Sequence, residues 1–401
     1  MRRIFIVAAA ACAASAEIQW EPEPNLFAKG RSPKFVARRA HGILALYSSG
    51  GNLYYRASND VGDSFSPPLR VNHVEGEVSD HGENSALLLL APDDLHLYAV
   101  WNARDPQNPQ GSLIRFSRAG AMNPTWSPAV TLNDDGLPVS HSFQGAAVAP
   151  DGRIFVAWLD GRDKTPGTAS LYLTWSEDGG KSWAKNVKAA SAVCPCCRAA
   201  IGFAGRTVVV TYRGVEAGDI RDILAVTSKE DGTWTAPTVV GRDHWKIKGC
   251  PHVGASVASV GDRVFVAWYT EGGGKPAIYL AESRDGAQSW LPKKLVSGGT
   301  LDPTHPYLAA GEDRVAVIWQ ARDPTQSAGW GKMSAFYREI TLDGRMGPLQ
   351  CAAAGKTSVT YPSGALGMSG RVYLGWTETS AGESTAYFLR GRAKVLTSAR
   401  E

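Results

Sequence analysis

An aromatic residue recurs at the end of an apolar, β-rich run along the whole chain, and this repeat constrains the fold more than any other feature. The intervals between successive aromatics are 51 to 57 residues. A turn and a short alternating strand precede each aromatic, as at residues 150–158, and a polar loop and two further strands follow it. Repeats of this length with about four strands are typical of β-propeller blades. The repeating aromatics are Tyr47, Trp101, Trp158, Tyr212, Trp268, Trp319 and Trp376.

The number of modules sets the architecture. A lone four-stranded sheet cannot bury both faces, so such modules stack around an axis. The sequence therefore predicts an all-β protein, a β-propeller of four-stranded antiparallel blades. Seven blades are favoured because seven modules cover nearly the whole chain, and six are the alternative if the first or last module is degenerate. Residues 17–401 then form a single propeller domain, in which residues 18–21 supply a strand that closes the ring against the last blade.

A turn of the form S-x-D-x-[GA]-x-S-[FW] occurs at residues 58–65, 176–183 and 283–290. Its aspartate can accept hydrogen bonds from nearby N–H groups, and its aromatic can pack onto the sheet. A contracted copy spans residues 228–234, and a worn copy ends at Trp126. The pattern resembles the Asp-box, or BNR repeat, of the sialidase superfamily of β-propellers. The resemblance implies a structural role for these turns, at the rim opposite the ligand-binding face.

The N-terminal residues give an expected location. Two arginines precede an apolar run at residues 4–14, and residues 14–16 read Ala-Ser-Ala, a small-x-small cleavage site. The run is too short to span a bilayer. We therefore expect residues 1–16 to be a cleaved signal peptide and the mature protein to be secreted or periplasmic. A lipoprotein site at Cys12 is the weaker alternative.

Composition limits the classes of partner. The chain has 42 basic and 38 acidic residues and a net charge of +4. This excess is too small to indicate nucleic acid or a membrane surface as a partner. No other segment has the composition of a transmembrane helix. The sequence does not determine the oligomeric state.

Polar, charged and sulfur-bearing residues concentrate where each module begins. In a propeller the first strand of each blade lines the central channel, and the loops that enter these strands form one face. Ligands usually bind there, because that face collects side chains from every blade. The candidate residues are 31–34, 80–84, 141–144, 194–198 and 250–252, with His305 and Tyr361.

Four of the five cysteines that remain after signal cleavage fall in register on adjacent modules. Alignment of Tyr212 with Trp268 matches the Cys-Pro-Cys that begins at residue 194 with the Cys-Pro-His that begins at residue 250. In an oxidising compartment, one or two disulfides between neighbouring loops are favoured. The alternatives are a reactive thiol and a soft-metal site for copper or zinc. The metal ligands would be Cys194, Cys196, Cys197, Cys250 and His252.

The odd cysteine count leaves at least one thiol free, unless chains are cross-linked. The sequence assigns that role to Cys351, which stands apart from the others and is expected to be buried.

Three further matches to sialidases concern the active site. Members of that family clamp the carboxylate of a terminal sugar with arginines, attack with a tyrosine that has a glutamate partner, and use an aspartate as acid and base. Arg31, in Arg-Ser-Pro, is similar to the first residue of the family's R-I-P motif, and Arg213 stands where a second clamp arginine belongs. Tyr361 has surroundings that resemble those of the nucleophile. The resemblance therefore implies Tyr361, Asp80, Arg31 and Arg213 as catalytic residues, with Asp80 as a substitute acid.

The departures from the family pattern keep two classes of function open. The glutamate expected before Arg213 falls at Cys196, and the third clamp arginine has no clear counterpart. The first hypothesis is an exported glycoside hydrolase of the exo-sialidase type that acts on an acidic sugar. The second is a non-catalytic propeller that binds a glycan or a metal at its mouth, or that serves as a protein-interaction scaffold. The expected ligand is a glycan or a small acidic molecule.

Overall fold

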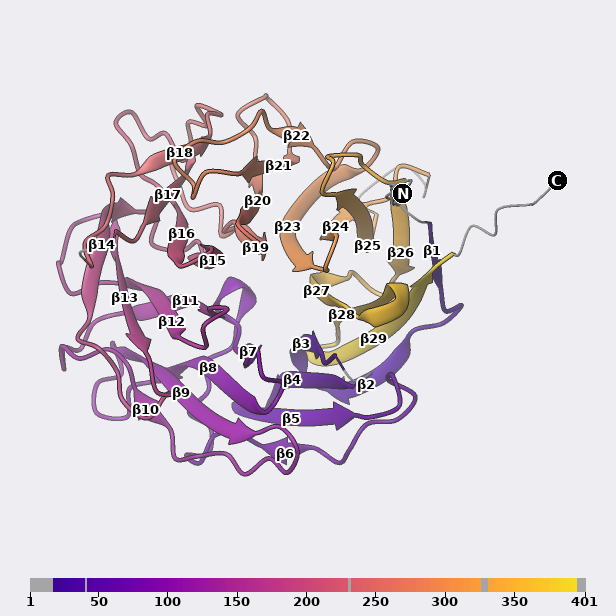
Figure 1. Ribbon diagram of the computed structural model, residues 1–401, viewed down its shortest axis with the longest axis horizontal. Coiled ribbons are helices and arrows are strands. Elements are labelled where there is room, and N and C mark those ends of the chain that lie inside the picture. Colours follow the sequence, from indigo (N-terminus) through magenta and orange to yellow (C-terminus); the bar gives the residue numbers. More distant parts are fainter. Residues whose placement is uncertain (1–16, 40–41, 230–231, 326–330, 395–401) are drawn as a thin grey trace, which may run out of the picture.

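The computed structural model describes residues 17–39, 42–229, 232–325 and 331–394. Within these residues the strands form seven antiparallel sheets arranged as a ring around one axis (Figure 1). The prediction of an all-β propeller is confirmed, with seven blades rather than six. The expected signal peptide lies outside the described residues. No helix of the described part is long and apolar enough to cross a membrane.

Each blade runs from an inner strand beside the axis to an outer strand at the rim. The inner strands are β3 (Arg31–Ala37), β7 (Leu87–Leu90), β11 (His141–Val148), β15 (Ala200–Ala204), β19 (Ser256–Val260), β23 (Leu301–Ala310) and β27 (Thr360–Leu366). The second strands are β4 (Ile43–Ser49), β8 (His96–Arg104), β12 (Ile154–Asp160), β16 (Thr207–Arg213), β20 (Arg263–Thr270), β24 (Arg314–Arg322) and β28 (Arg371–Ser380).

The outer half of each blade holds the third and fourth strands. The third strands are β5 (Asn52–Ser58), β9 (Ser112–Gly120), β13 (Ala169–Ser176), β17 (Ile223–Thr227), β21 (Ala277–Ser283), β25 (Met333–Thr341) and β29 (Glu383–Ala393). The outer strands of the first six blades are β6 (Leu69–Arg70), β10 (Val130–Thr131), β14 (Val187–Val193), β18 (Thr238–Gly241), β22 (Lys294–Leu295) and β26 (Gln350–Ala354). The described part also contains the 3-10 helices η1 (Gly82–Asn84) and η2 (Met368–Gly370).

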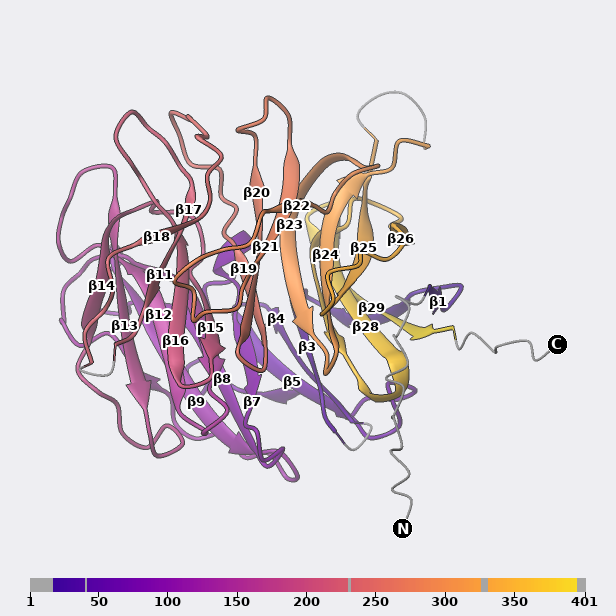
Figure 2. The same ribbon diagram turned by 45° about the horizontal axis from the view of Figure 1, so that its top comes forward.

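The two ends of the chain close the ring on the seventh blade. β1 (Ile18–Trp20) and β2 (Asn25–Lys29) both pair antiparallel with β29, and Ile18 lies opposite Ala393. Figure 2 shows β1 beside the end of β29. The predicted closing strand is confirmed over Ile18–Trp20. Opening the ring would therefore break backbone hydrogen bonds as well as side-chain contacts.

The repeating aromatics lie on the second strands and fill the spaces between blades. Trp158, for example, packs with Tyr98, Val100 and Phe116 of the preceding blade. Seven hydrophobic cores in the described chain each join one blade to its predecessor in this way. Because neighbouring blades cover both faces, every residue of β12 is buried, where the sequence predicted an alternating strand.

The three predicted Asp-box turns join third strands to fourth strands and share one hydrogen-bond pattern. In the second turn the Ser176 hydroxyl donates to Asp178 and accepts from the Gly180 N–H at 2.8 Å. Asp178 also accepts from the N–H and the hydroxyl of Ser182, and these bonds lower the pKa of Asp178. Because neighbouring strands are antiparallel, the turns lie at the opposite edge from the first residues of the inner strands. Part of the contracted copy, residues 230–231, lies outside the described residues.

Candidate functional site

Four inner strands carry the same distortion near their first residues. In β3, β11, β23 and β27 two residues oppose a single residue of the second strand, which makes a β-bulge. The single residue is in each case the repeating aromatic of that blade. In each bulge one non-glycine residue has a positive φ, which costs roughly 1–3 kcal/mol of backbone strain. The four strained residues lie at equivalent positions of their blades. The strained residues are Ser32 (φ 54°), Phe143 (φ 55°), His305 (φ 51°) and Tyr361 (φ 49°).

Hydrogen bonds from the preceding blade hold three of these bulges. The bulged N–H groups leave the strand ladder and need other acceptors. The Ser32 N–H donates to Thr377 Oγ1 at 2.8 Å, that of Phe143 to Asn84 Oδ1 at 2.8 Å, and that of Tyr361 to Gln320 Oε1 at 2.7 Å. Backbone strain that neighbouring residues hold in place is common at ligand sites. The bulges therefore indicate a ligand site near the axis.

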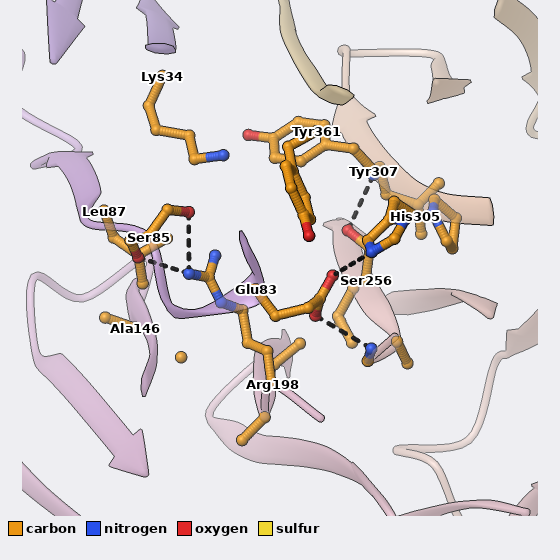
Figure 3. A pocket seen from close by; sticks show the side chains of 18 of the residues that line it. Lys34, Glu83, Ser85, Leu87, Ala146, Arg198, Ser256, His305, Tyr307 and Tyr361 are labelled. Carbon is orange, nitrogen blue, oxygen red and sulfur yellow. Dashed lines mark hydrogen bonds and ion pairs between the residues drawn. The ribbon is translucent and has the colours of Figure 1, made fainter. Parts of the chain in front are cut away.

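A cavity of about 190 Å³ lies on the axis, and all seven blades contribute to its wall. The apolar part of the wall comes from residues such as Leu87, Ile201 and Leu308. Figure 3 shows the polar side chains of the wall pointing toward one another across the cavity. They are Lys34, Glu83, Ser85, Arg198, Ser256, His305, Tyr307 and Tyr361.

Two cations in this wall have no carboxylate within ion-pair distance among the described residues. The Lys34 side chain is buried, and its Nζ lies over the ring of Tyr307, 5.9 Å from the ring centroid. Arg198 donates from Nη2 to the Ser85 hydroxyl at 3.1 Å and to the Ser85 carbonyl, while its Nε has no partner. Burial, and next the charge of Arg198, lowers the pKa of Lys34 to about 8. Poorly paired cations that face a cavity favour an anionic ligand.

Glu83, His305 and Tyr361 lie together on another side of the cavity. Glu83 accepts from the Gly254 N–H at 3.0 Å, and its other oxygen lies 3.9 Å from His305 Nε2. The Tyr361 hydroxyl is so close to Gly82 that a Cβ there would stand 2.7 Å from the oxygen. Burial and then the charge of Glu83 raise the pKa of Tyr361, whereas burial lowers the pKa of His305. The phenol and the imidazole are therefore neutral at pH 7, next to a carboxylic side chain.

Of the four catalytic residues implied by the sialidase resemblance, only Tyr361 lines this cavity. Arg31 is exposed at the first position of β3. Asp80 accepts from the Ser32 hydroxyl at 2.8 Å, and burial raises its pKa, but it is not part of the cavity wall.

Arg213 is fully buried, and backbone carbonyls take its donors. Its guanidinium donates to Arg221 at 2.7 Å, to Tyr269 at 2.8 Å and to Val253 at 3.0 Å, and it lies over the ring of Trp245. These contacts join the end of β16 to the loop before β17 in its own blade and to the next blade through Val253 and Tyr269. The two-arginine clamp expected from Arg31 and Arg213 is therefore not assembled at this cavity.

The predicted cysteine group forms at the mouth of the ring, beside the cavity. The Sγ atoms of Cys194, Cys196 and Cys197 lie 3.7 to 3.8 Å apart, and all three side chains are buried. Cys250 is exposed, and its thiol interacts electrostatically with those of Cys196 and Cys194 but lies outside the group of three sulfur atoms within 4.8 Å of one another. Hydrogen bonds from Cys196 and Cys197, and then the charge of Arg221, lower the pKa of Cys194.

The favoured disulfides do not appear, because no two described cysteines have sulfur atoms at bonding distance. His252 is exposed and is not one of the clustered side chains. Cys351 lies apart, as expected, but it is exposed on β26 rather than buried.

Lys34 and Glu83 fell within the predicted channel segments without being assigned a role, and Tyr307 was missed. The sequence favoured an ion pair over anion binding for Arg198, but no carboxylate of the described residues lies within ion-pair distance of it. One signal points to two of these residues. An X-Pro pair recurs at the bulges, at residues 32–33, 305–306 and 361–362, and Lys34 and Tyr307 directly follow the first two prolines.

The comparisons with known proteins support the fold. No protein-family model matches the sequence, and no curated protein sequence matches it. An ulvan lyase of polysaccharide lyase family PL25, bound to -[GlcA(1-4)Rha3S]-, is similar in structure, with a TM-score of 0.57, 12% identity, and coverage of 96% of this chain and 97% of the other. The α-L-arabinofuranosidase Arb93A from Fusarium graminearum is also similar, with a TM-score of 0.51 and 13% identity. The match covers 79% of this chain and 96% of the other.

The NanB sialidase from Streptococcus pneumoniae gives a TM-score of 0.50 and 10% identity, with 88% of this chain and 83% of the other covered. The protein therefore has a sialidase-like β-propeller fold. At these identities the likeness extends to the fold and no further.

Proposed function

We propose that the central cavity binds an acidic sugar and that the protein hydrolyses its glycosidic bond in the manner of an exo-sialidase. One observation carries this proposal: the poorly paired cations Lys34 and Arg198 share a cavity with Tyr361 and Glu83. A carboxylate on the sugar would accept hydrogen bonds from both cations and offset the cost of their burial. The names of the three similar structures refer to enzymes of glycans, which agrees with a sugar as the ligand.

The residues at the cavity have the properties that hydrolysis needs. The Tyr361 hydroxyl would attack the anomeric carbon while Glu83 accepts its proton, and a neutral nucleophile is not repelled by the sugar carboxylate. His305, on the same wall, would protonate the leaving oxygen in place of the predicted Asp80, which is not part of the wall. Water would then release the sugar from Tyr361.

The pH dependence follows from His305. Burial lowers the pKa of this imidazole from its ordinary value of 6.5, so the protonated donor exists only at acid pH. Hydrolysis should therefore be fastest at acid pH and should fall as the pH rises through the lowered pKa.

The test is turnover of fluorogenic glycosides, with sialosides and uronides set against neutral glycosides of the same leaving group. We expect turnover of an acidic glycoside and a loss of at least about 100-fold in kcat for Tyr361→Phe. Tyr307→Phe is the matched control, because it removes a hydroxyl from the same cavity without a carboxylate beside it. Turnover unaffected by Tyr361→Phe in a folded variant would remove the mechanism.

The lowered pKa of Lys34 favours a second candidate, β-elimination on a uronic acid polymer. A neutral Lys34 amine would take the proton next to the sugar carboxylate, Arg198 would hold that carboxylate, and Tyr361 would give its proton to the leaving oxygen as the C–O bond breaks. This reaction yields an unsaturated sugar that absorbs in the ultraviolet. Its rate should rise with pH toward about 8, opposite to the hydrolytic profile.

Binding of an acidic sugar without turnover of any substrate would instead indicate the non-catalytic propeller. Export after removal of residues 1–16 is part of the proposal, and N-terminal sequencing of protein from the separated culture fractions tests it.

A further inference from the structure

The cysteine group has a geometry that the proposed sugar chemistry does not use. The three Sγ–Sγ distances are 3.7, 3.7 and 3.8 Å, a nearly equilateral triangle. A metal ion that binds sulfur tetrahedrally at about 2.3 Å places its ligand atoms about 3.8 Å from one another. Cys194, Cys196 and Cys197 therefore already have the spacing of one face of a metal–thiolate tetrahedron.

Cys250, on the corresponding loop of the next blade, is the candidate for a fourth sulfur ligand. The loop with the three clustered cysteines leads into β15, and the loop with Cys250 leads into β19. The Cys250 thiol interacts electrostatically with those of Cys196 and Cys194, and it is exposed where the other three are buried. Its Sγ lies outside the group of three sulfur atoms that are within 4.8 Å of one another, so binding of an ion would draw the Cys250 loop inward. An ion could thus enter from the solvent side and be enclosed by Cys250.

Two buried arginines next to the cluster require negative charge. Arg221 is 7% exposed, its Nη1 donates to Cys194 Sγ at 3.3 Å, and its Nε has no partner. Arg213 donates only to carbonyls, and its charge acts on Cys197. Among the described residues, neither guanidinium has a carboxylate within 4.0 Å. Buried charges of this kind need an opposite charge.

The charge balance distinguishes the candidates for this site. Disulfides are neutral and would leave both arginines uncompensated. Four thiolates around a divalent ion carry two net negative charges, which two arginines balance, whereas a monovalent ion would leave a surplus of negative charge. Zinc takes four-cysteine sites of this form, and their closed coordination is structural.

We propose that Cys194, Cys196, Cys197 and Cys250 bind a zinc ion in a closed tetrahedral site. The ion joins the entry loops of the fourth and fifth blades. Because Arg198 directly follows Cys197, the ion also fixes the loop that brings Arg198 to the cavity. The site does not depend on the proposed sugar chemistry, since its readout is metal content.

The experiment uses the full chain, exported to the periplasm in zinc-supplemented medium and purified without a metal-affinity tag. We expect about one zinc per chain. Replacement by Co²⁺ should give the intense thiolate-to-metal absorption of a tetrahedral four-sulfur site. Cys196→Ser and Cys250→Ser should lose the metal, and the matched control Cys351→Ser should keep it.

Measurements on the unsubstituted protein keep the proposal testable if the cysteine variants fail to fold. Its denatured, unreduced mass should show every cysteine reduced, and a chelator should make the clustered thiols reactive as zinc is released. A denatured mass below that of the fully reduced chain would show that disulfides have formed, and it would overturn the site. A metal-free protein that binds no Co²⁺ would overturn it as well. Copper in place of zinc would overturn the assignment of the ion.

Discussion

The imidazole of His305 meets the phenol of Tyr361 edge-on, with ring centroids 4.6 Å apart, although the two residues come from different blades. Both occupy bulges at positive φ. The same bulges that strain the inner strands therefore also create the contact between two neutral, titratable rings at the cavity. Strain, burial and polar convergence coincide at this point, as they do at ligand sites in general.

The approach of Tyr361 to Gly82 allows a local test of the site. In Gly82→Ala the new Cβ would stand 2.7 Å from the Tyr361 hydroxyl oxygen, so the phenol must move. We expect kcat to fall at least about 10-fold, since a displaced nucleophile loses its near-attack geometry. The matched control is Gly50→Ala, because Gly50 has nearly the same φ (56° against 57°) and nothing near its Cβ position. Equal effects of the two changes would show that backbone strain, not Tyr361, is responsible.

Burial of the charged Lys34 side chain should favour ligand binding but lower the free energy of unfolding. Its pKa falls from 10.5 to about 8 in the folded protein, so the unfolded chain holds this proton more tightly. Wild-type stability should therefore rise with pH between about 8 and 10.5. Lys34→Met should increase the free energy of unfolding by about 1–3 kcal/mol at pH 7, and this gain should shrink as the pH rises through that window. Urea denaturation of both proteins at several pH values measures these free energies. A Lys34→Met protein that is less stable than the wild type at pH 7 would contradict the prediction.

Arg213 should act on stability and not on sugar binding. Arg213→Met leaves three backbone carbonyls without their donor, so we expect a loss of about 3 kcal/mol or more in the free energy of unfolding. Any folded fraction should bind an acidic sugar within about 3-fold of the wild-type affinity. Arg31→Met, at an exposed position, should change stability by no more than about 0.5 kcal/mol. A stable Arg213→Met protein that no longer binds an acidic sugar would instead support Arg213 as a residue that binds the sugar carboxylate.

The Asp-box turns should be structural. In Gly180→Ala the Cβ would lie 2.4 Å from the ring of Phe116, at φ 81°, and we expect a destabilisation of about 2–4 kcal/mol. Gly152→Ala has a similar φ of 89° and no neighbour within 4 Å, so it separates backbone strain from the clash. Thermal unfolding measures both. A turn variant that folds normally but loses ligand binding would show that the turn has a functional role.

The fold could be predicted because its signal is repeated. Each of the seven aromatics fills one space between blades, so a spacing of 51 to 57 residues was enough to define the modules. The proximity of Cys194 and Cys250 also followed from module alignment, because equivalent loops of adjacent blades meet at the mouth. The closing strand could be predicted from the excess chain before the first module.

The details of the site depend on geometry that the sequence pattern does not contain. A bulge changes the facing of every later residue in a strand, so Lys34 could not be separated from its neighbours by periodicity. Arg213 matched an expected clamp position, but its guanidinium donates to the carbonyls of Val253 and Tyr269, which belong to the next blade and are distant in the chain. The spacing of the three clustered sulfurs depends on the fold of the loop, since Cys-Pro-Cys-Cys is equally compatible with disulfides.

The most direct test of the central claim is calorimetric titration of the protein with an acidic oligosaccharide and with its neutral, carboxyl-reduced counterpart. The account predicts that the acidic sugar binds at least about 10-fold more tightly, as charge-assisted hydrogen bonds to Lys34 and Arg198 require. It also predicts that Arg198→Met removes most of this preference. Equal affinity for the two sugars, or a preference that survives in Arg198→Met, would contradict it.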